Sequence, residues 1–413
     1  MSGFFSSRWV QAPSGASEVA GGGLPTGFRA AGVACGIKAD GAKDLGMVVS
    51  DAPATTSAAR FTRSGTQSAP VLLCRERADL RALRAVLVNS GNANAATGSR
   101  GLHDAAKMQG GAALIAGVSE QHVAVASTGV IGVPLSTDLI TRGTHALAHQ
   151  LRADGDAEFA EAIRTTDTLP KQVTLDLALS GGTVRISVQA KGAGMISPNF
   201  ATLLVFVQTD AAIDADEADL LLGVCVKRSF DRITVDGQLS TSDMIMLQCS
   251  GESGVAVEPE TPDERVFGEA LDAALRQVAL LVAHDGEGAR RVARVVVHGG
   301  DQAAVERVAH AVADSPLVKT AVYGADPNWG RVIQAVGAAL PDSAPLAVDI
   351  DVEGIPVCRG GGFVSHDPEA LAAAVTRDEV EFEITLPGQG AETERFFSDL
   401  GQEYVTINAE YTT

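Results

Sequence analysis

Aromatic side chains are scarce in this chain: Phe, Tyr and Trp together make up 4% of its 413 residues. A ligand site built as a cage of rings is therefore not expected. Hydrophobic residues are nevertheless 46% of the total, which is enough to form a large core. At this length we expect two domains, or two lobes that share one site, rather than one average core.

Positive charge is also in short supply. The formal net charge is -19 at pH 7, and Lys and Arg form no basic stripe. Because phosphate contacts need clustered Lys and Arg, the sequence argues against binding nucleic acid or an anionic membrane. No apolar run approaches membrane-spanning length. The N-terminus also lacks the basic start, apolar segment and small-residue cleavage site of a signal peptide.

Cysteine motifs are missing as well. The five cysteines are widely scattered and none belongs to a C-x-x-C arrangement: Cys35, Cys74, Cys225, Cys249 and Cys358. This usage is typical of a reducing compartment, so we expect a cytoplasmic protein. No metal site is predicted either, since His145 and His149 are one helical turn apart but lack the glutamate of the H-E-x-x-H motif.

Hydrophobic periodicity predicts helices and strands mixed in both halves, after a flexible lead-in of residues 1–24 that is rich in Gly, Ser and Ala. Hairpins outnumber βαβ units, so an α+β fold in layers is expected. The predicted strands are 27–38, 44–51, 69–74, 85–88, 122–126, 172–179, 183–189, 203–211, 232–236, 242–249, 291–297, 346–352, 380–386 and one that ends in 404–413. The predicted helices are 103–118, 136–152 with a continuation to 164, 214–229, 264–283 and 303–313.

One stretch organises the chain: Lys191-Gly-Ala-Gly-Met-Ile-Ser-Pro-Asn-Phe-Ala-Thr202, followed at once by the apolar run 203–211. A threonine hydroxyl needs a base to become a good nucleophile. If the peptide bond between Ala201 and Thr202 is cut, the freed α-amino group, with a reference pKa of about 7.7 to 8.0, can be that base. The same hydroxyl can make the cut by attacking the Ala201 carbonyl, after which water hydrolyses the ester. On its own this pattern also fits an ordinary strand residue.

This stretch, KGAGMISPNFATLLVFVQTDA, resembles the signature of the ornithine acetyltransferase family, the bifunctional ornithine acetyltransferase/N-acetylglutamate synthase of arginine biosynthesis. The resemblance runs from about Gly27 to Thr413, and several ordered blocks are more specific than one motif. Those blocks are NSGNANAATG at 89–98, STGVIG at 127–132, TTDTLPK at 165–171, SFDRITVDG at 229–237, STSD at 240–243, SPLVKTAVYGADPNWGRVIQAVG at 315–337 and YVTINAEYTT at 404–413.

The resemblance implies a layered, two-lobed fold of the N-terminal-nucleophile type. The chain would cut itself into an alpha chain, residues 25–201, and a beta chain, residues 202–413, that stay associated. A heterotetramer of two alpha and two beta chains is the expected assembly.

The resemblance also implies roles for single residues. Thr202 is the nucleophile, and Thr128 with Gly129 matches the oxyanion-hole pair, whose donors stabilise a tetrahedral intermediate. The positions that match substrate contacts are Thr165, Lys191, Thr202, Glu287, Asn408 and Thr413. Ornithine carries a carboxylate and a side-chain ammonium, which Lys191 and Glu287 could bind respectively.

The implied reaction is ping-pong. N-acetylornithine acylates Thr202, ornithine leaves, and glutamate takes the acetyl group to give N-acetylglutamate. No cofactor is expected. Whether acetyl-CoA also donates an acetyl group is left open, since no Walker-type glycine loop announces a CoA site. Departures from the family pattern at Ala96, Phe200 and Gln238 leave acceptor preference open too.

Two other functions stay in view. The same self-cleaving architecture supports amidases and aminopeptidases, in which water replaces glutamate as acceptor. A secondary-metabolism acyltransferase paralogue, acting on related acyl amino acids, is the other alternative.

Overall fold

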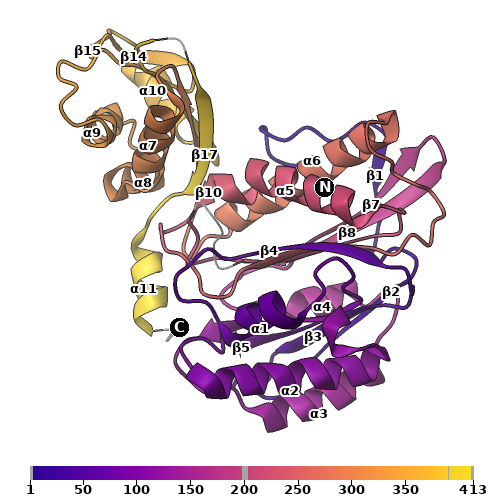
Figure 1. Cartoon of the computed structure of the whole chain (residues 1–413). Coiled ribbons are helices and arrows are strands. Elements are labelled where there is room, and N and C mark those ends of the chain that lie inside the picture. Colours follow the sequence, from indigo (N-terminus) through magenta and orange to yellow (C-terminus); the bar gives the residue numbers. More distant parts are fainter. Residues whose placement is uncertain (1–2, 198–202, 389, 411–413) are drawn as a thin grey trace. The chain divides into compact units, whose positions relative to one another are not determined.

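The computed structural model describes residues 3–197, 203–388 and 390–410 (Figure 1). These residues form two compact units. Unit 1 contains the chain up to Asp231 together with Leu239–Ala279. Unit 2 contains Arg232–Gln238 and the described residues from Leu280 onward. Helices and strands are mixed in both units, and each unit contains a mixed sheet, so the prediction of an α+β fold is confirmed.

Unit 1 contains two sheets. The six-stranded sheet has the order β1-β7-β8-β9-β11-β4, and only its β9–β11 pair is parallel. Its strands are β1 (Ala16–Glu18), β7 (Lys171–Leu179), β8 (Gly182–Lys191), β9 (Leu204–Thr209), β11 (Met244–Cys249) and β4 (Thr56–Phe61). The four-stranded sheet, of order β2-β3-β5-β6, has strands β2 (Phe28–Val33), β3 (Leu45–Ser50), β5 (Ala85–Asn92) and β6 (Val123–Val130). In that sheet the β5–β6 pair is parallel.

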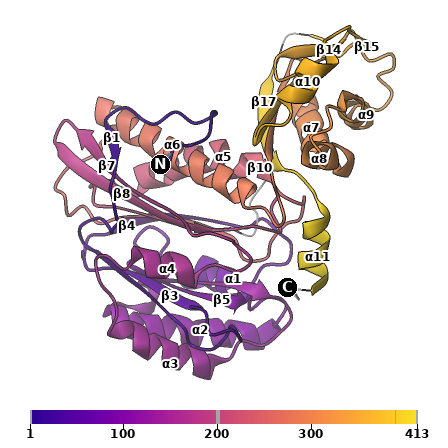
Figure 2. The same ribbon diagram turned by 180° about the vertical axis from the view of Figure 1, so that it is seen from behind.

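Helices cover both sheets of unit 1 (Figures 1 and 2). Helices α2 and α3 lie on the outer side of the four-stranded sheet, and α5 and α6 lie over the outer side of the six-stranded sheet. Helix α4 packs between the sheets, in contact with β2, β3, β7 and β8. The helices of this unit are α1 (Ala69–Arg77), α2 (Gly98–Ala116), α3 (Thr137–Ala148), α4 (Asp156–Ala162), α5 (Ala215–Arg228) and α6 (Pro262–His284), and α6 continues into unit 2.

Two glycines explain how α4 fits so closely between the sheets. A side chain at Gly32 on β2 would overlap the backbone carbonyl of Glu158, and a Cβ at Gly46 on β3 would lie 2.8 Å from the Phe159 ring. Phe159 in turn packs edge-on against Phe206 of β9, with ring centroids 5.3 Å apart. This pair links α4 to the central strand and closes the core between the layers.

Unit 2 is built on a seven-stranded sheet of order β10-β17-β12-β16-β13-β14-β15. Its strands are β10 (Ile233–Thr234), β12 (Val292–His298), β13 (Asp349–Val352), β14 (Ile355–Arg359), β15 (Gly362–Phe363), β16 (Glu379–Thr385) and β17 (Glu392–Ser398). The helices are α7 (Gln302–Ala313), α8 (Pro316–Tyr323), α9 (Trp329–Ala339), α10 (Pro368–Ala374) and α11 (Gln402–Glu410). Valines dominate the core, where β12 packs against α7.

Most predicted elements occur in the structure, including the hairpin β7–β8 and the buried strand β9. Two predictions are wrong. Residues 69–74 belong to α1, a helix that follows Ser68 and carries Pro70 in its first turn, where proline favours helix initiation. The C-terminal strand ends at Ser398, and the β-branched segment predicted to extend it forms α11 instead. The elements that were not predicted at all are the helices α8, α9 and α10 and the strands β1, β4, β14 and β15.

Residues 16–18, in the N-terminal lead-in, form the edge strand β1 and pair with β7. Among the helices that the structure describes, none combines the length and apolar character needed to cross a membrane.

Candidate active site

Thr128 and Gly129 lie at the carboxyl end of β6, where this strand pairs with β5. Ser90 and Gly91 are their partners, and the register becomes irregular at Asn92. Gly129 has a φ of +128°, and a Cβ at this position would overlap the Gly91 backbone and lie 2.6 Å from the Asn92 nitrogen. Only glycine fits so close to the neighbouring strand, which gives the end of β6 a fixed backbone conformation.

A chain of asparagines supports this strand end. Ser127 Oγ donates to Asn89 Oδ1 at 2.6 Å, and Asn89 Nδ2 donates to the Asn92 carbonyl at 2.8 Å. Asn92 Nδ2 then donates to the Val133 carbonyl at 3.1 Å. These bonds explain why the block at 89–98 is rich in asparagine: the amides satisfy backbone groups that irregular strand ends leave unpaired. Ala96, one of the departures noted above, has a φ of +56°.

Next to this strand end lies a buried carboxylate that the sequence analysis did not single out. Asp167 Oδ2 accepts the Thr165 N–H at 3.0 Å. Its Oδ1 accepts Lys171 Nζ at 2.8 Å and the Gly192 N–H at 2.6 Å. Burial alone would raise the pKa of Asp167, but the charges of Lys191 and Lys171 and these hydrogen bonds outweigh it and hold that pKa well below its ordinary value. Asp167 is therefore ionised at neutral pH.

Lys191 is the last residue of β8 and its side chain is buried, with 1% of its surface exposed. Its Nζ donates to Thr128 Oγ1 at 3.5 Å. Across the sheet, Lys191 pairs with Leu204, the first residue of β9. The structure thus connects three of the predicted site residues, Thr128, Lys191 and Thr165. Lys191 contacts Thr128 directly. Asp167 accepts hydrogen bonds from the backbone of Thr165 and of Gly192, the residue after Lys191.

A second buried acid, Asp243, directly precedes β11 in the chain and contacts the residue before β9. Asp243 Oδ1 accepts the Leu203 N–H at 3.0 Å, and its Oδ2 has no hydrogen-bond partner in the described part of the chain. Burial raises the pKa of Asp243 well above its ordinary value, and this effect outweighs the Leu203 N–H, nearby hydroxyl groups and the charge of Lys191, which all act in the opposite direction. The two acids near Lys191 are thus shifted in opposite directions, a feature typical of functional sites.

In unit 2, Glu287 and Asn408 are in direct contact. Asn408 Nδ2 donates to Glu287 Oε2 at 2.6 Å and to the Tyr404 carbonyl at 3.0 Å. Glu287 lies in the turn that follows α6, and its side chain is largely buried. Gly288 has a φ of +72°, and a Cβ there would lie 2.8 Å from the Tyr404 nitrogen. This close approach holds the Glu287 turn against the first turn of α11.

Lys319 joins the end of β17 to the segment that follows β10. Its Nζ, buried beside the Phe397 ring, donates to the carbonyls of Val235 at 2.9 Å and Ser398 at 2.7 Å. Burial lowers the pKa of Lys319 to about 8, against the opposing effect of nearby aspartates. Tyr404 on α11 donates to Asp236 Oδ2 at 3.3 Å, which ties the helix to the same loop as Val235.

The remaining predicted residues, Ala201, Thr202 and Thr413, lie outside the described residues, as does Phe200. The residues that sequence reasoning missed, Asp167 and Asp243, stand in the blocks TTDTLPK and STSD. The available signal was an acid next to small polar residues, shortly before the predicted strand 172–179 for Asp167 and at the start of the predicted strand 242–249 for Asp243.

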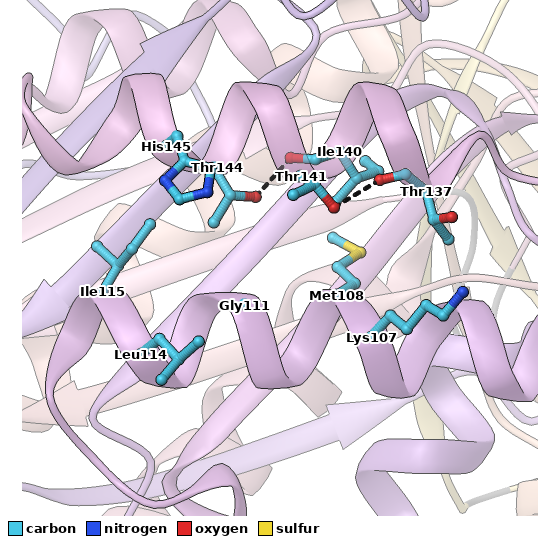
Figure 3. A pocket seen from close by; sticks show the side chains of 10 residues that line it. All are labelled: Lys107, Met108, Gly111, Leu114, Ile115, Thr137, Ile140, Thr141, Thr144 and His145. Carbon is cyan, nitrogen blue, oxygen red and sulfur yellow. Dashed lines mark hydrogen bonds between the residues drawn. The ribbon is translucent and has the colours of Figure 1, made fainter.

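A hollow of about 130 Å³ lies elsewhere in unit 1, between α2 and α3 (Figure 3). Its floor is apolar, and its two central hydroxyls are used within α3: Thr144 Oγ1 donates to the Ile140 carbonyl at 2.6 Å, and Thr141 Oγ1 donates to the Thr137 carbonyl at 2.8 Å. None of the predicted site residues lines this hollow. No group of three or more His, Cys, Asp or Glu within residues 3–197, 203–388 and 390–410 is placed to hold a metal ion.

Taken together, the fold defines an α+β protein with mixed sheets, and the site is a buried cluster of opposite charges beside a glycine-dependent strand end. A model of the ArgJ family matches residues 29–413. The chain belongs to this family.

Individual relatives agree with the family match. The arginine biosynthesis bifunctional protein ArgJ of Symbiobacterium thermophilum is 42% identical over 393 residues, which cover 94% of this chain and 98% of the relative. The protein of the same name from Geobacter sulfurreducens is 42% identical over 392 residues, covering 94% and 99%. Among solved structures, the ornithine acetyltransferase of Mycobacterium tuberculosis complexed with ornithine is 39% identical. Its match covers 46% of this chain and 99% of that chain, with a TM-score of 0.41.

Proposed function

We propose that this chain is an ornithine acetyltransferase of arginine biosynthesis, which moves the acetyl group of N-acetylornithine to glutamate and so yields ornithine and N-acetylglutamate. The observation that carries this proposal is membership of the ArgJ family over residues 29–413. A second activity, synthesis of N-acetylglutamate from acetyl-CoA, is part of the proposal on the grounds of the family resemblance, and it agrees with the relatives being named bifunctional. The five cysteines are all free thiols, which supports the proposal that the protein works in the cytoplasm.

Thr202 is the proposed nucleophile. Its Oγ attacks the acetyl carbonyl of N-acetylornithine, the carbon–nitrogen bond breaks, and the leaving nitrogen of ornithine takes the proton that Oγ gives up through the α-amino group. The amine of glutamate then attacks the acetyl ester and restores the free hydroxyl. Thr128 and Gly129 are the proposed oxyanion hole, a role that needs donors held in place before the charge develops. The fixed backbone at the end of β6 supports that assignment.

Substrate recognition is assigned to charged side chains and their partners. Lys191 binds the substrate carboxylate, and Thr165 is proposed as a further contact. The Asp167 carboxylate accepts the N–H groups of Thr165 and of Gly192, the residue after Lys191. Glu287 binds the side-chain ammonium of ornithine. Asn408 Nδ2 donates a hydrogen bond to one carboxylate oxygen of Glu287. Thr413 is proposed as a further substrate contact on family grounds alone.

Self-cleavage between Ala201 and Thr202 would yield the alpha chain, 25–201, and the beta chain, 202–413, of an N-terminal-nucleophile fold. The six-stranded sheet supports the idea that these fragments stay together. Strand β9 of the beta chain pairs with β8 of the alpha chain over six residues, and β11 of the beta chain pairs with β4 of the alpha chain over six more. Assembly into a heterotetramer of two alpha and two beta chains is part of the same proposal.

Two measurements test these proposals separately. On a denaturing gel the purified protein should give two fragments whose masses match a cut before Thr202, and Thr202→Ala should give one full-length band. Uncut wild-type protein would reject the threonine mechanism. The transfer is tested by mixing N-acetylornithine with glutamate and measuring ornithine and N-acetylglutamate. Ornithine release that does not depend on glutamate would instead indicate the amidase reaction, and transfer only to other amino acids would indicate the secondary-metabolism paralogue.

A further inference from the structure

Leu203, the residue directly after the proposed nucleophile, is held by two consecutive residues of another segment. Its N–H donates to Asp243 Oδ1 at 3.0 Å, and its carbonyl accepts the Met244 N–H at 3.2 Å. The regular pairing of β9 with β11 begins one residue later, at Leu204 and Met244. The Asp243 side chain therefore extends the contact between these two segments by one residue in the direction of Thr202 along the chain.

We propose that Asp243 is a positioning residue for the nucleophile: its carboxyl oxygen fixes the Leu203 N–H, and with it the peptide bond on the carboxyl side of Thr202, during both the cut and the acetyl transfer. The role needs a hydrogen-bond acceptor at this place and no negative charge. This inference rests on the proposed function, because it takes Thr202 as the nucleophile.

The loop that carries Asp243 is itself fixed by buried hydroxyl groups. Ser240, Thr241 and Ser242 are all buried. Thr62 Oγ1 donates to the Ser240 carbonyl at 2.7 Å, and Ser240 Oγ accepts the Ser242 N–H at 3.0 Å. The Thr62 N–H, just after β4, donates to the Asp243 carbonyl at 3.2 Å. A side chain on a backbone held in this way places its acceptor at a fixed point, which is what positioning a reacting group needs.

The burial of Asp243 indicates that it acts without its charge. The side chain is 1% exposed, and burial raises its pKa well above the ordinary value. This effect outweighs the groups that act in the opposite direction, which are the Leu203 N–H, the hydroxyls of Ser240 and Thr62, and the charge of Lys191. The carbonyl oxygen of a neutral carboxyl still accepts an N–H, as does the amide oxygen of asparagine. Asparagine is therefore the substitution that should keep the role.

Asp210 offers a matched comparison at the opposite end of β9. Its carboxylate also accepts backbone N–H groups, from Arg185 at 2.7 Å and Thr26 at 3.2 Å, and the side chain is buried. Asp210 directly follows the last residue of β9, whereas Leu203 directly precedes the first. Loss of the acceptor at Asp210 therefore disturbs the same strand at the end that lies away from Thr202.

The first test compares Asp243→Leu with Asp243→Asn. Leucine has a similar size but no acceptor, so the Leu203 N–H loses its partner. We expect less of the chain to be cut before Thr202 at a fixed time on a denaturing gel. We also expect kcat per cut chain to fall by at least about 100-fold, because a small displacement of a reacting group costs about that much. KM for N-acetylornithine and for glutamate should stay within about threefold, and Asp243→Asn should keep both the cut and kcat within about threefold of wild type.

Asp210→Leu is the control for a general weakening of the fold. Both leucine variants leave a backbone N–H without its acceptor, so both should melt at a lower temperature than wild type. Asp210→Leu should nevertheless be cut and turn over as wild type does. If stability alone set the activity, the two leucine variants would lose it alike.

A second measurement does not require Asp243→Leu to fold. In wild-type protein with isotope-labelled leucine, the Leu203 amide should exchange slowly with heavy water in NMR spectra, because its hydrogen bond to Asp243 has to open first. Asp243→Asn should show the same slow exchange, and the signal is identified by its absence from Leu203→Ile. Fast exchange of this amide in either protein would overturn the inference.

Three kinetic outcomes also overturn the inference. In the first, Asp243→Leu is cut and turns over as wild type does. In the second, Asp243→Asn loses as much kcat as Asp243→Leu, and in the third the change falls on KM instead of kcat. Failure of the proposed function looks different, because wild-type protein would then remain uncut or transfer no acetyl group, while the slow exchange of the Leu203 amide would be unaffected.

Discussion

Lys191 and Leu204 are paired directly across the antiparallel strands β8 and β9. Lys191, with its buried ammonium, is therefore on β8. The neighbouring strand, β9, begins two residues after Thr202. The segment between these strands has no helix or strand of its own in the described residues, so the register of β8 against β9 fixes where both of its ends emerge. A site that uses Lys191 and Thr202 needs this register, and a slip by one residue would turn Lys191 to the other face of the sheet.

Gly129→Ala should abolish the activity. The new methyl group would overlap the backbone of Gly91 on β5, and φ at this position is +128°. We expect a loss of at least about 3 kcal/mol in the free energy of unfolding and a fall in kcat of more than about 100-fold, because the proposed oxyanion donors would move. Thermal melting and steady-state kinetics measure the two effects.

Gly132→Ala is the control for this change. Gly132 also has a positive φ, +81°, but a Cβ there meets no atom within 4 Å. It should cost only the backbone strain, about 1 kcal/mol, and leave kcat within about threefold. Equal loss of activity in both variants would show that close approach to β5 does not matter for catalysis.

Asp243→Asn and Asp167→Asn should change stability in opposite directions. The raised pKa of Asp243 means that the folded state keeps a proton that the unfolded state releases above about pH 4, so stability falls as the pH rises toward the folded pKa. Asn removes that cost, and Asp243→Asn should melt higher than wild type at pH 7 but not at pH 4. Asp167 has a lowered pKa, so its ionised form stabilises the fold above the unfolded pKa and Asp167→Asn should melt lower at pH 7. A shift of the same sign in both variants would contradict the assignment.

Glu287→Gln should separate the two half-reactions. N-acetylornithine carries the side-chain ammonium that Glu287 is proposed to bind, whereas glutamate does not. We therefore expect KM for N-acetylornithine to rise by about 10-fold to 100-fold and KM for glutamate to change little. Glu403→Gln, an exposed acid on α11, is the control and should change neither value. Equal increases for both substrates would place Glu287 outside the ammonium subsite.

Lys319→Met should destabilise unit 2. The substitution keeps an apolar stem of similar length. It removes the ammonium donor from the buried Ser398 carbonyl and leaves the Val235 carbonyl with only the 3.3 Å hydrogen bond from Ser398 Oγ. The expected cost is about 2 to 4 kcal/mol, measured by denaturant unfolding. An unchanged midpoint would show that water replaces the ammonium. A weaker affinity for substrate in variant protein that is still folded would show that the hydrogen bonds of Lys319 also position α11.

Local signals in the sequence were sufficient for several elements. Asp214 precedes an amphipathic stretch and caps α5 by accepting the Asp216 and Glu217 N–H groups. Ser180-Gly-Gly182 between two alternating segments predicted the β7–β8 hairpin, which the structure confirms. The apolar run after Thr202 predicted β9, which is buried on both faces. In each case, adjacent residues determine the outcome.

Other features depend on contacts that no local pattern contains. Asp167 receives its donors from residues 165, 171 and 192, and only the packing of β7 against β8 brings them together. The pKa of Asp243 is raised by its burial, and the sequence STSD does not reveal that this side chain is buried. At α1 the apolar residues 71–74 suit a strand as well as a helix, and the packing of this helix against α2 and β6 decides between them.

The six-stranded sheet combines strands from before and after Thr202, and this affects how the protein would fold and mature. A cut before Thr202 assigns β9 and β11 to one product and their neighbours β8 and β4 to the other. Neither product could complete this sheet by itself, so folding would have to precede the proposed cut. Once cut and unfolded, the two pieces would have to meet again in solution, and the rate of refolding would depend on protein concentration. The uncut Thr202→Ala chain would refold at a rate independent of concentration, at least as far as this sheet is concerned.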